Sequence, residues 1–364
     1  MAPLLAWILL AAPPPAHPPV EALLAAHGLG APERTARLDA VAQGLADRLG
    51  GTTPPDPRTA SGHLRWLMQA QGLGDAVVYP FTLRHRDPEE VAPALTRLVA
   101  QIDRKQPPTH LGVATRAVGD EQVTAVVLVH RGVRFDAPLP RSAPLDTVLR
   151  LSGDLRRGYY RPRVVVQPPT GPIRERPAWT DQRRLEVNVY LDAGPGAYGV
   201  EVLADSVDGP VVLVNHPIHA GEPPPSRPTV KLAPEGADTA EHLLALVQGQ
   251  RAQAGLPHLR PHDVLVRVAG EHAVELAASG RLTHRSADTG TLRTRLKAAG
   301  LGAALSAENL AQAPDAHAAL EAFRRSPGHA RNLLLPQLTH AGVARAGAFW
   351  VLVMAALPPD APAP

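Results

Sequence analysis

The chain has 364 residues, of which 45% are hydrophobic and only 4% aromatic, and its 40 prolines occur in short runs. This length and composition predict two or three small domains joined by stiff connectors rather than one large core. The net charge of +3 gives no general nucleic-acid footprint. The absence of cysteine excludes disulfides, thiolate metal sites and a cysteine nucleophile, so any metal must be held by His, Asp or Glu.

The N-terminus carries an apolar run over residues 4–12, followed by a proline-rich stretch over residues 13–19. The run is shorter than the roughly 20 apolar residues that cross a bilayer. It resembles a signal peptide, although no Lys or Arg precedes it and no clean Ala-x-Ala site follows. We therefore predict that residues 1–19 are a signal peptide and a proline-rich segment, and that the protein is extracytoplasmic, either periplasmic or secreted. A misassigned start codon or an ordinary buried helix is the alternative, and no other stretch predicts a transmembrane span.

Clusters of Pro and Gly divide the rest of the chain into three blocks. The blocks cover residues 20–130, 137–220 and 237–357, and a proline-rich linker occupies residues 221–236. A linker of this composition is extended and semi-rigid, so the blocks should fold as separate units.

The middle block shows a period-two pattern in which apolar residues alternate with polar ones. The pattern predicts half-buried strands and a small antiparallel β-sandwich. Between residues 131 and 184 there are twelve Arg and five acidic residues. This excess could bind an anionic envelope polymer, and the alternative is a solvated sheet face with scattered arginines. The alternating apolar positions are Leu185, Val187, Val189 and Leu191.

The C-terminal block begins with two predicted helices. Asp238 and Glu241 resemble a capping box, and the helix that they open should end near Gly255. The second helix covers residues 261–280 and places His272 on its apolar stripe, where a hydrogen-bonded core histidine is the simplest interpretation. The remaining predicted elements are a loop with His284, a short helix over 291–299, an extended segment with Glu308, a helix over 314–325, a turn with His329 and a hairpin over 343–354.

Several short motifs in this block occur in an order that resembles the CAP superfamily. That superfamily unites cysteine-rich secretory proteins, venom antigens, plant pathogenesis-related proteins and many bacterial exported proteins, and the bacterial branch is the closer match. The resemblance covers about a third of the chain. The motifs are Arg251-x-x-x-Gly255-Leu256-x-x-Leu259, His272-Ala273, His284-Arg285-Ser286, Glu308-Asn309-Leu310-Ala311, Ser326-Pro327-Gly328-His329-x-x-Asn332-Leu333, Gly342-Val343 and Phe349-Trp350.

The resemblance implies an α-β-α sandwich with a cleft that gathers two histidines and one or two glutamates, and that holds a divalent metal in several members. His284, Glu308 and His329 match the cleft positions one by one. Two imidazoles and one carboxylate are a sufficient ligand set for zinc with an open position for water. Such a water can be acidified to a pKa of about 7, which is a route to hydrolysis.

The sequence departs from the family at Ser326, where animal and plant members carry a second glutamate. The implied metal site is therefore incomplete. Ser326, His272 and Asn309 are further candidates for the cleft. A Ser-His-Asp triad is not predicted, because no Gly-x-Ser-x-Gly elbow is present, and phosphate-binding loops are absent as well.

The N-terminal block repeats the C-terminal block in outline, at three anchors of nearly constant offset. The repeat predicts a degenerate α/β copy of the C-terminal domain, and an unrelated α/β domain is the alternative. The anchors are Leu64-Arg65-x-x-Met68-x-Ala70-x-Gly72-Leu73-Gly74 against Leu292-Arg293-x-x-Leu296-x-Ala298-x-Gly300-Leu301-Gly302, Thr109-His110-x-Gly112-Val113-Ala114 against Thr339-His340-x-Gly342-Val343-Ala344, and Val41-Ala42 against Val268-Ala269.

At these offsets the three cleft residues fall on Asp56, Pro80 and a position near Val99, so the copy should fold without the chemistry. The sequence thus predicts an α+β protein with a C-terminal α-β-α sandwich, preceded by a β-sandwich and the degenerate copy.

Three functions are compatible with this organisation. They are an exported CAP-domain protein whose cleft binds a divalent metal, a non-enzymatic protein that binds lipid or an envelope polymer, and a scaffold. The sequence gives neither the ligand, nor a reaction, nor the oligomeric state.

Overall fold

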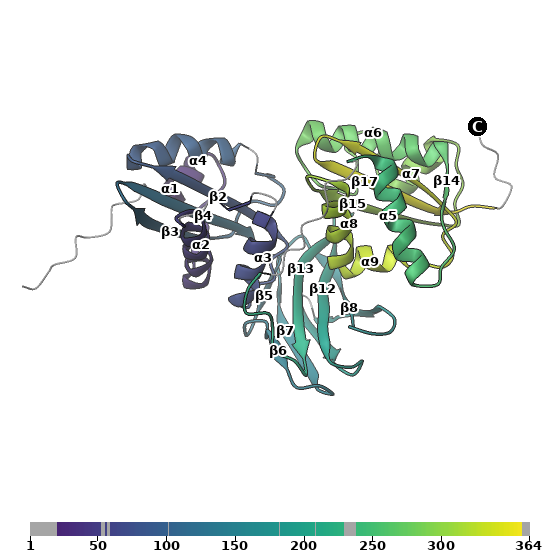
Figure 1. The fold of residues 1–364 in the computed structure, drawn as a ribbon, viewed down its shortest axis with the longest axis horizontal. Coiled ribbons are helices and arrows are strands. Elements are labelled where there is room, and N and C mark those ends of the chain that lie inside the picture. The colour runs from purple at the N-terminus through teal and green to yellow at the C-terminus, as the bar shows by residue number, and fades with distance from the viewer. Residues whose placement is uncertain are drawn as a thin grey trace, which may run out of the picture.

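The computed structural model describes residues 20–51, 55–56, 59–100, 102–181, 183–207, 209–228 and 238–358. The predicted signal peptide lies outside the described residues, as does the second half of the predicted linker. Figure 1 shows three lobes in chain order, with the β-sandwich between two mixed α/β units. No helix among the described residues is both long enough and apolar enough to cross a membrane.

The N-terminal unit has a four-stranded sheet with helices on both faces (Figure 1). Its sheet order is β1-β3-β4-β2. Helix α2 packs on one face, and α1 and α4 pack on the other. The elements are α1 (Val20–Ala26), β1 (Glu33–Arg34), α2 (Ala36–Leu49), α3 (Ala60–Ala70), β2 (Val77–His85), η2 (Pro88–Glu90), α4 (Val91–Val99), β3 (His110–Val118) and β4 (Glu121–His130).

The middle unit consists of two sheets, of order β10-β11-β7-β5 and β6-β13-β12-β8-β9, around one apolar core. The alternating apolar residues Leu185, Val187 and Val189 are buried in that core, as the period-two pattern predicted. The elements are β5 (Val133–Phe135), β6 (Ser142–Ala143), β7 (Val148–Leu155), β8 (Tyr160–Gln167), β9 (Arg174–Pro177), β10 (Trp179–Asp181), β11 (Arg184–Tyr190), β12 (Gly196–Ser206) and β13 (Gly209–Ala220).

One boundary of this unit needs correction. The sandwich begins before residue 137, because the short strand β5 pairs with β7 through Val133 and Leu155. Three residues are too few to display a period-two pattern, so this strand could not be predicted from periodicity.

The C-terminal unit is an α-β-α sandwich, as predicted. Its sheet order is β14-β16-β17-β15, and the central strand β17 is buried on both faces. Trp350, Leu352 and Met354 face α5 and α8, whereas Val351 and Val353 face α6 and α7. The elements are α5 (Ala240–Gln253), β14 (Arg260–Pro261), α6 (Asp263–Ser279), α7 (Leu292–Ala298), β15 (Leu305–Gln312), α8 (Ala316–Arg325), α9 (Pro327–Leu333), β16 (His340–Ala346) and β17 (Phe349–Ala356).

The start of α5 differs from the prediction in its cap. The N-cap is Thr239, whose hydroxyl accepts a hydrogen bond from the backbone N–H of His242. Asp238 instead forms an ion pair with Arg345 on β16. Thr239 directly precedes the helix and is therefore at the N-cap position, whereas Asp238 is one residue further away and pairs with the sheet instead.

The N-terminal and C-terminal units have the same strand order and the same pairing directions. A close backbone crossing also recurs: a Cβ atom at Gly112 would lie 2.0 Å from the carbonyl carbon of Leu38, and one at Gly342 would lie 2.2 Å from that of Leu265. Common topology is therefore a structural fact, while descent of one unit from the other stays a prediction.

Candidate functional site

Glu308 lies at the centre of a cluster in the C-terminal unit. It projects from β15, opposite Val353 of the central strand, and its side chain is only 3% exposed. One carboxylate oxygen, Oε1, lies 2.9 Å from Nδ1 of His284. Because a carboxylate only accepts hydrogen bonds, the imidazole donates from Nδ1, and in the neutral imidazole Nε2 is then the acceptor. The carboxylate thus fixes the orientation and tautomer of His284, whose side chain is 35% exposed.

The loop that carries His284 is held in place by hydrogen bonds to side chains at its base. It begins at Gly280, whose φ of 66° ends α6. The hydroxyl of Ser286 accepts hydrogen bonds from the N–H groups of Asp288 and Thr289. The N–H of Ala287 donates to Oε1 of Glu275 on α6, at 2.7 Å. A loop anchored in this way can hold an imidazole against a buried carboxylate.

His329 comes from the first turn of α9, which Ser326 caps. Asn309, which follows Glu308 on β15, donates from Nδ2 to the backbone carbonyl of His329 at 3.1 Å, and its Oδ1 accepts from Asn332. The ring centroid of His329 lies 5.9 Å from that of His284. The strand and the helix therefore bring together the three residues that the sequence predicted.

Arg295 is the member of the cluster that the sequence analysis missed. Its Nη2 donates to Oε2 of Glu308 at 2.7 Å and to the carbonyl of His284 at 3.2 Å. Its side chain is 4% exposed. One signal was available: Leu292, Arg295, Leu296 and Ala299 share one face of α7, so the arginine stands on an apolar stripe.

The charges of the cluster follow from this pairing. Burial by itself raises the pKa of Glu308, but the hydrogen bond from His284 and the positive charge of Arg295 outweigh it, so the pKa is lowered overall. Burial, together with the proximity of His284, lowers the pKa of His329 to about 3. Glu308 is therefore ionised and His329 neutral over the physiological pH range.

The two other candidates for the cleft have their polar atoms engaged elsewhere. His272 is 1% exposed and hydrogen-bonds to Thr283 O at 2.8 Å and to Glu275 at 3.3 Å. Ser326 donates from its hydroxyl to Glu201 of the sandwich at 2.6 Å. His272 is a satisfied core histidine, and Ser326 has an interdomain contact.

The arrangement of these side chains is a poor fit to a divalent metal. Within the part of the chain that the structure describes, no group of three His, Asp or Glu side chains has an arrangement that could hold one. The carboxylate of Glu308 has one oxygen on His284 and the other on Arg295. A guanidinium at this distance repels a divalent cation, and each carboxylate oxygen already accepts one hydrogen bond from a neighbouring side chain. The arrangement does not fit a metal while the ion pair is intact.

The N-terminal unit has different side chains at the matching positions. The register of β2 places Pro80 opposite Val127, as β15 places Glu308 opposite Val353. Leu67 on α3 stands where α7 carries Arg295, at the offset of the sequence repeat. The N-terminal unit thus lacks both members of the central ion pair.

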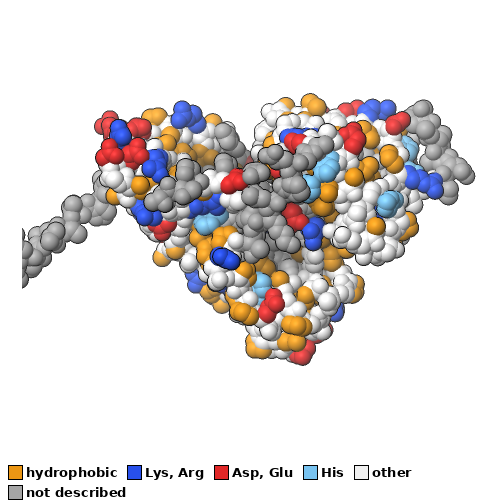
Figure 2. All heavy atoms as spheres, viewed as in Figure 1, with side chains coloured by type: hydrophobic (Ala, Val, Ile, Leu, Met, Phe, Trp, Pro, Cys, Tyr) orange, Lys and Arg blue, Asp and Glu red, His pale blue; other side chains and the backbone are white. Residues whose placement is uncertain are grey.

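Of the twelve arginines between residues 131 and 184, six pair with described acids of the sandwich. Ion pairs join Arg134 to Asp154, Arg150 to Glu186, Arg161 to Asp205, Arg163 to Glu175, Arg174 to Asp192 and Arg184 to Asp136. On the face that Figure 2 draws, basic side chains are scattered over the three lobes and do not gather into one patch. These contacts support the solvated sheet face over a site for an anionic polymer.

Comparison with known proteins identifies the C-terminal unit. Its layers, its sheet order and its histidine and glutamate cluster define an α-β-α domain with a largely buried polar cluster. Residues 244–351 match the sequence model of the cysteine-rich secretory protein family, CAP. The C-terminal unit is therefore a CAP domain. No curated protein matches the chain.

Solved structures with similarity to the chain include three bacterial proteins. An extracellular protein containing an SCP domain from Bacillus anthracis is 21% identical over 47% of this chain, with a TM-score of 0.32, and the match spans 64% of that protein. An outer surface protein from Borrelia burgdorferi is 24% identical, with a TM-score of 0.31, over 32% of this chain and 92% of its own. A cysteine-rich secretory protein from Staphylococcus aureus is 11% identical, with a TM-score of 0.30, over 59% of this chain and 87% of its own.

Proposed function

We propose that the chain is an extracytoplasmic CAP-domain protein whose cleft binds a polar ligand directly, through His284, without a resident metal ion. The observation that carries the proposal is the buried ion pair between Arg295 and Glu308. The pair neutralises the carboxylate inside the protein, and the carboxylate orients the partly exposed imidazole of His284. A fixed imidazole with a free Nε2 is suited to accept a hydrogen bond from a ligand hydroxyl or amide.

A binding role is favoured over nucleophilic catalysis by the position of Ser326. This serine is the closest in sequence to His329, yet its hydroxyl donates to Glu201 and not to an imidazole. A serine nucleophile needs a hydrogen bond to its general base. The envelope location rests on the N-terminal apolar run and on the extracellular and outer-surface descriptions of the bacterial proteins above.

Isothermal titration of the full-length chain with zinc tests the metal-free cleft. The wild type should bind zinc no more tightly than the His284→Ala, His329→Ala double variant. Zinc that binds the wild type with one-to-one stoichiometry, and that the double variant does not bind, would establish the metal-binding alternative instead. Metal analysis of protein purified without added metal serves as the independent check.

Sedimentation with isolated envelope fractions tests the binding role. We expect the wild type to sediment with the fraction that contains the ligand, and His284→Ala to remain in the supernatant. A variant at the exposed Arg285, which neighbours His284 in the same loop, serves as the matched control. Equal sedimentation of His284→Ala and the wild type would remove the cleft from the interaction. Loss of binding at high salt would indicate an attraction between charges, as a site for an anionic polymer requires.

A further inference from the structure

The loop between α3 and β2 in the N-terminal unit is a docking edge for the sandwich. The N–H of Asn215 on β13 donates to Gly74 O at 2.8 Å, and the N–H of Ala76 donates to Leu213 O at 3.2 Å. Asp75 and Val214 form an antiparallel bridge between these bonds. The loop thus accepts an extended strand through its backbone, as an exposed strand edge does.

The CAP domain has the same loop at the same place, between α7 and β15. Gly72, Gly74 and Ala76 correspond to Gly300, Gly302 and Ala304 at an offset of 228, which also joins the starts of β2 and β15. No strand among the described residues covers this loop. The backbone of Gly302 and Ala304 makes no hydrogen bond to any described residue, and both residues are exposed.

The glycines of the two loops have different surroundings. A Cβ atom at Gly74 would lie 2.8 Å from Val214 and 2.9 Å from Leu139, so the approach of the sandwich requires a glycine there. A Cβ atom at Gly302 would meet nothing within 4 Å, and its φ is not in the left-handed region. The close approach that explains Gly74 is therefore absent at Gly302 among the described residues.

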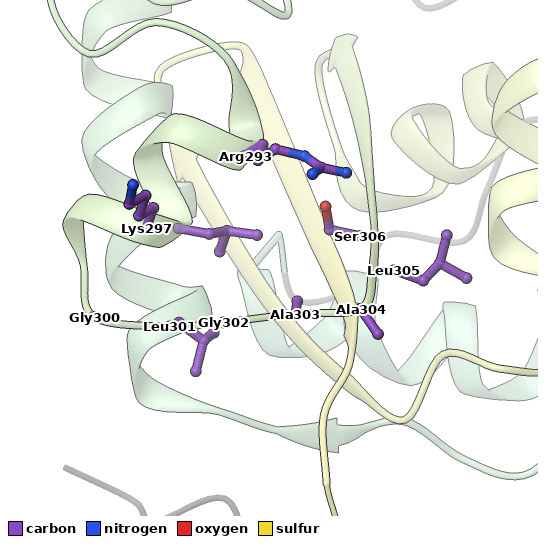
Figure 3. Close-up of a pocket in the computed structure, with 10 residues that line it drawn as sticks. Arg293, Lys297, Gly300, Leu301, Gly302, Ala303, Ala304, Leu305 and Ser306 are labelled. Carbon is purple, nitrogen blue, oxygen red and sulfur yellow. The ribbon is translucent and has the colours of Figure 1, made fainter.

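A cavity of 610 Å³ lies beside the uncovered loop. Arg293 and Lys297 of α7 line it, and Figure 3 shows Ser306 of β15 beside Arg293. Neither cation pairs with an acid in the described part of the chain, and no acidic residue occurs in the sequence between Asp288 and Glu308. The other side chains that line the cavity are mainly apolar: Leu296, Leu301, Ala303, Ala304 and Leu305. The surface thus combines two cations, apolar side chains and free backbone groups.

We propose that this loop docks an extended acidic segment of a partner protein, which adds as a short strand to residues 302–304 in the manner of β13 on residues 74–76. The free carbonyl of Gly302 and the free N–H of Ala304 supply the backbone hydrogen bonds. Arg293 and Lys297 select acidic side chains, because opposite charge steers and orients the segment. The surface shares no residue with the histidine cleft, so this proposal is independent of the function of that cleft.

A labelled peptide in which Glu alternates with Val tests this proposal by fluorescence anisotropy with the full-length chain. We expect saturable binding at low salt that weakens as salt screens the charges. The same peptide with Lys in place of Glu should not bind. Slower hydrogen exchange at the amides of residues 302–305 in the presence of the acidic peptide locates the site.

Gly302→Val places a side chain where the strand must approach, and we expect affinity to fall at least about tenfold. The variant should fold normally, because the space around Gly302 is open. Gly249→Val on the exposed face of α5 is the matched control, since nothing lies within 4 Å of a Cβ atom there either. Arg293→Glu with Lys297→Glu should invert the charge preference of the site. Absence of binding by the acidic peptide at low salt, or equal binding by the wild type and Gly302→Val, would overturn the proposal.

Discussion

Replacement of Arg295 with methionine is the sharpest perturbation of the cleft. Methionine keeps the apolar stem on the stripe of α7 but removes the cation from a pair whose side chains are 4% and 3% exposed. Removal of one partner from a buried ion pair leaves an uncompensated charge and costs about 3–5 kcal/mol. The hydrogen bond to the carbonyl of His284 is lost as well. Arg295→Met should therefore lower the free energy of unfolding of the CAP domain by about 3–5 kcal/mol.

Arg293→Met is the matched control, because Arg293 lies on the same helix but is exposed, and its change should stay within about 0.5 kcal/mol. Urea denaturation of the full-length chain measures both variants, and hydrogen exchange in peptides from β15 and β17 assigns the change to the CAP domain. Glu308→Gln combined with Arg295→Met should cost less than Arg295→Met alone, since no charge is then left buried. If Arg295→Met is no more destabilising than Arg293→Met, the ion pair does not contribute to the stability of the cleft as we infer.

Three further predictions concern pH and packing. Folding lowers the pKa of His329 from 6.5 to about 3, so between these pH values the unfolded chain binds one more proton than the folded chain, and the free energy of unfolding should fall as pH drops through this window. In a pH series of denaturation midpoints, His329→Gln should lose part of this pH dependence. An unchanged profile would contradict the assignment. Gly342→Ala should disrupt the domain, because the added Cβ atom would lie 2.2 Å from the Leu265 backbone. Gly270→Ala in the middle of α6 should instead be neutral or stabilise the domain by up to about 1 kcal/mol. Thermal unfolding compares the two variants, and equal effects would refute the packing argument. Glu201→Ala removes the carboxylate of the sandwich that accepts hydrogen bonds from Ser326 and Gly328 of the CAP domain, so the two domains should separate and small-angle scattering should show a larger radius of gyration. An unchanged radius would mean that other contacts hold the sandwich to the CAP domain.

The sequence predicted the C-terminal fold because its signals are local and periodic. The apolar stripe that carries His272, the glycine stop at residue 280 and the hairpin around Gly347 each depend on a few neighbouring residues, and all three occur in the structure. The three cleft residues could be named only because short motifs resembled those of a known family. Their spacing of more than 20 residues gave no geometric information by itself.

What the sequence could not predict depends on contacts between distant segments. The pairing of Arg295 with Glu308 requires α7 to lie against β15, and neither residue type nor spacing specifies that contact. Glu201 is a similar case: it lies between Val200 and Val202 on β12 and accepts a hydrogen bond from Ser326, 125 residues away. The role of a buried charged residue can be inferred only when its partner is known, and the tertiary structure determines which residue that partner is.

Zinc-edge anomalous diffraction from crystals grown with zinc chloride would test the metal-free cleft most directly. We predict no anomalous peak between His284, Glu308 and His329, and an intact hydrogen-bonded contact between Arg295 and Glu308. A peak within about 2.2 Å of the imidazole nitrogens and the carboxylate, with Arg295 displaced, would show that the cleft is a metal site.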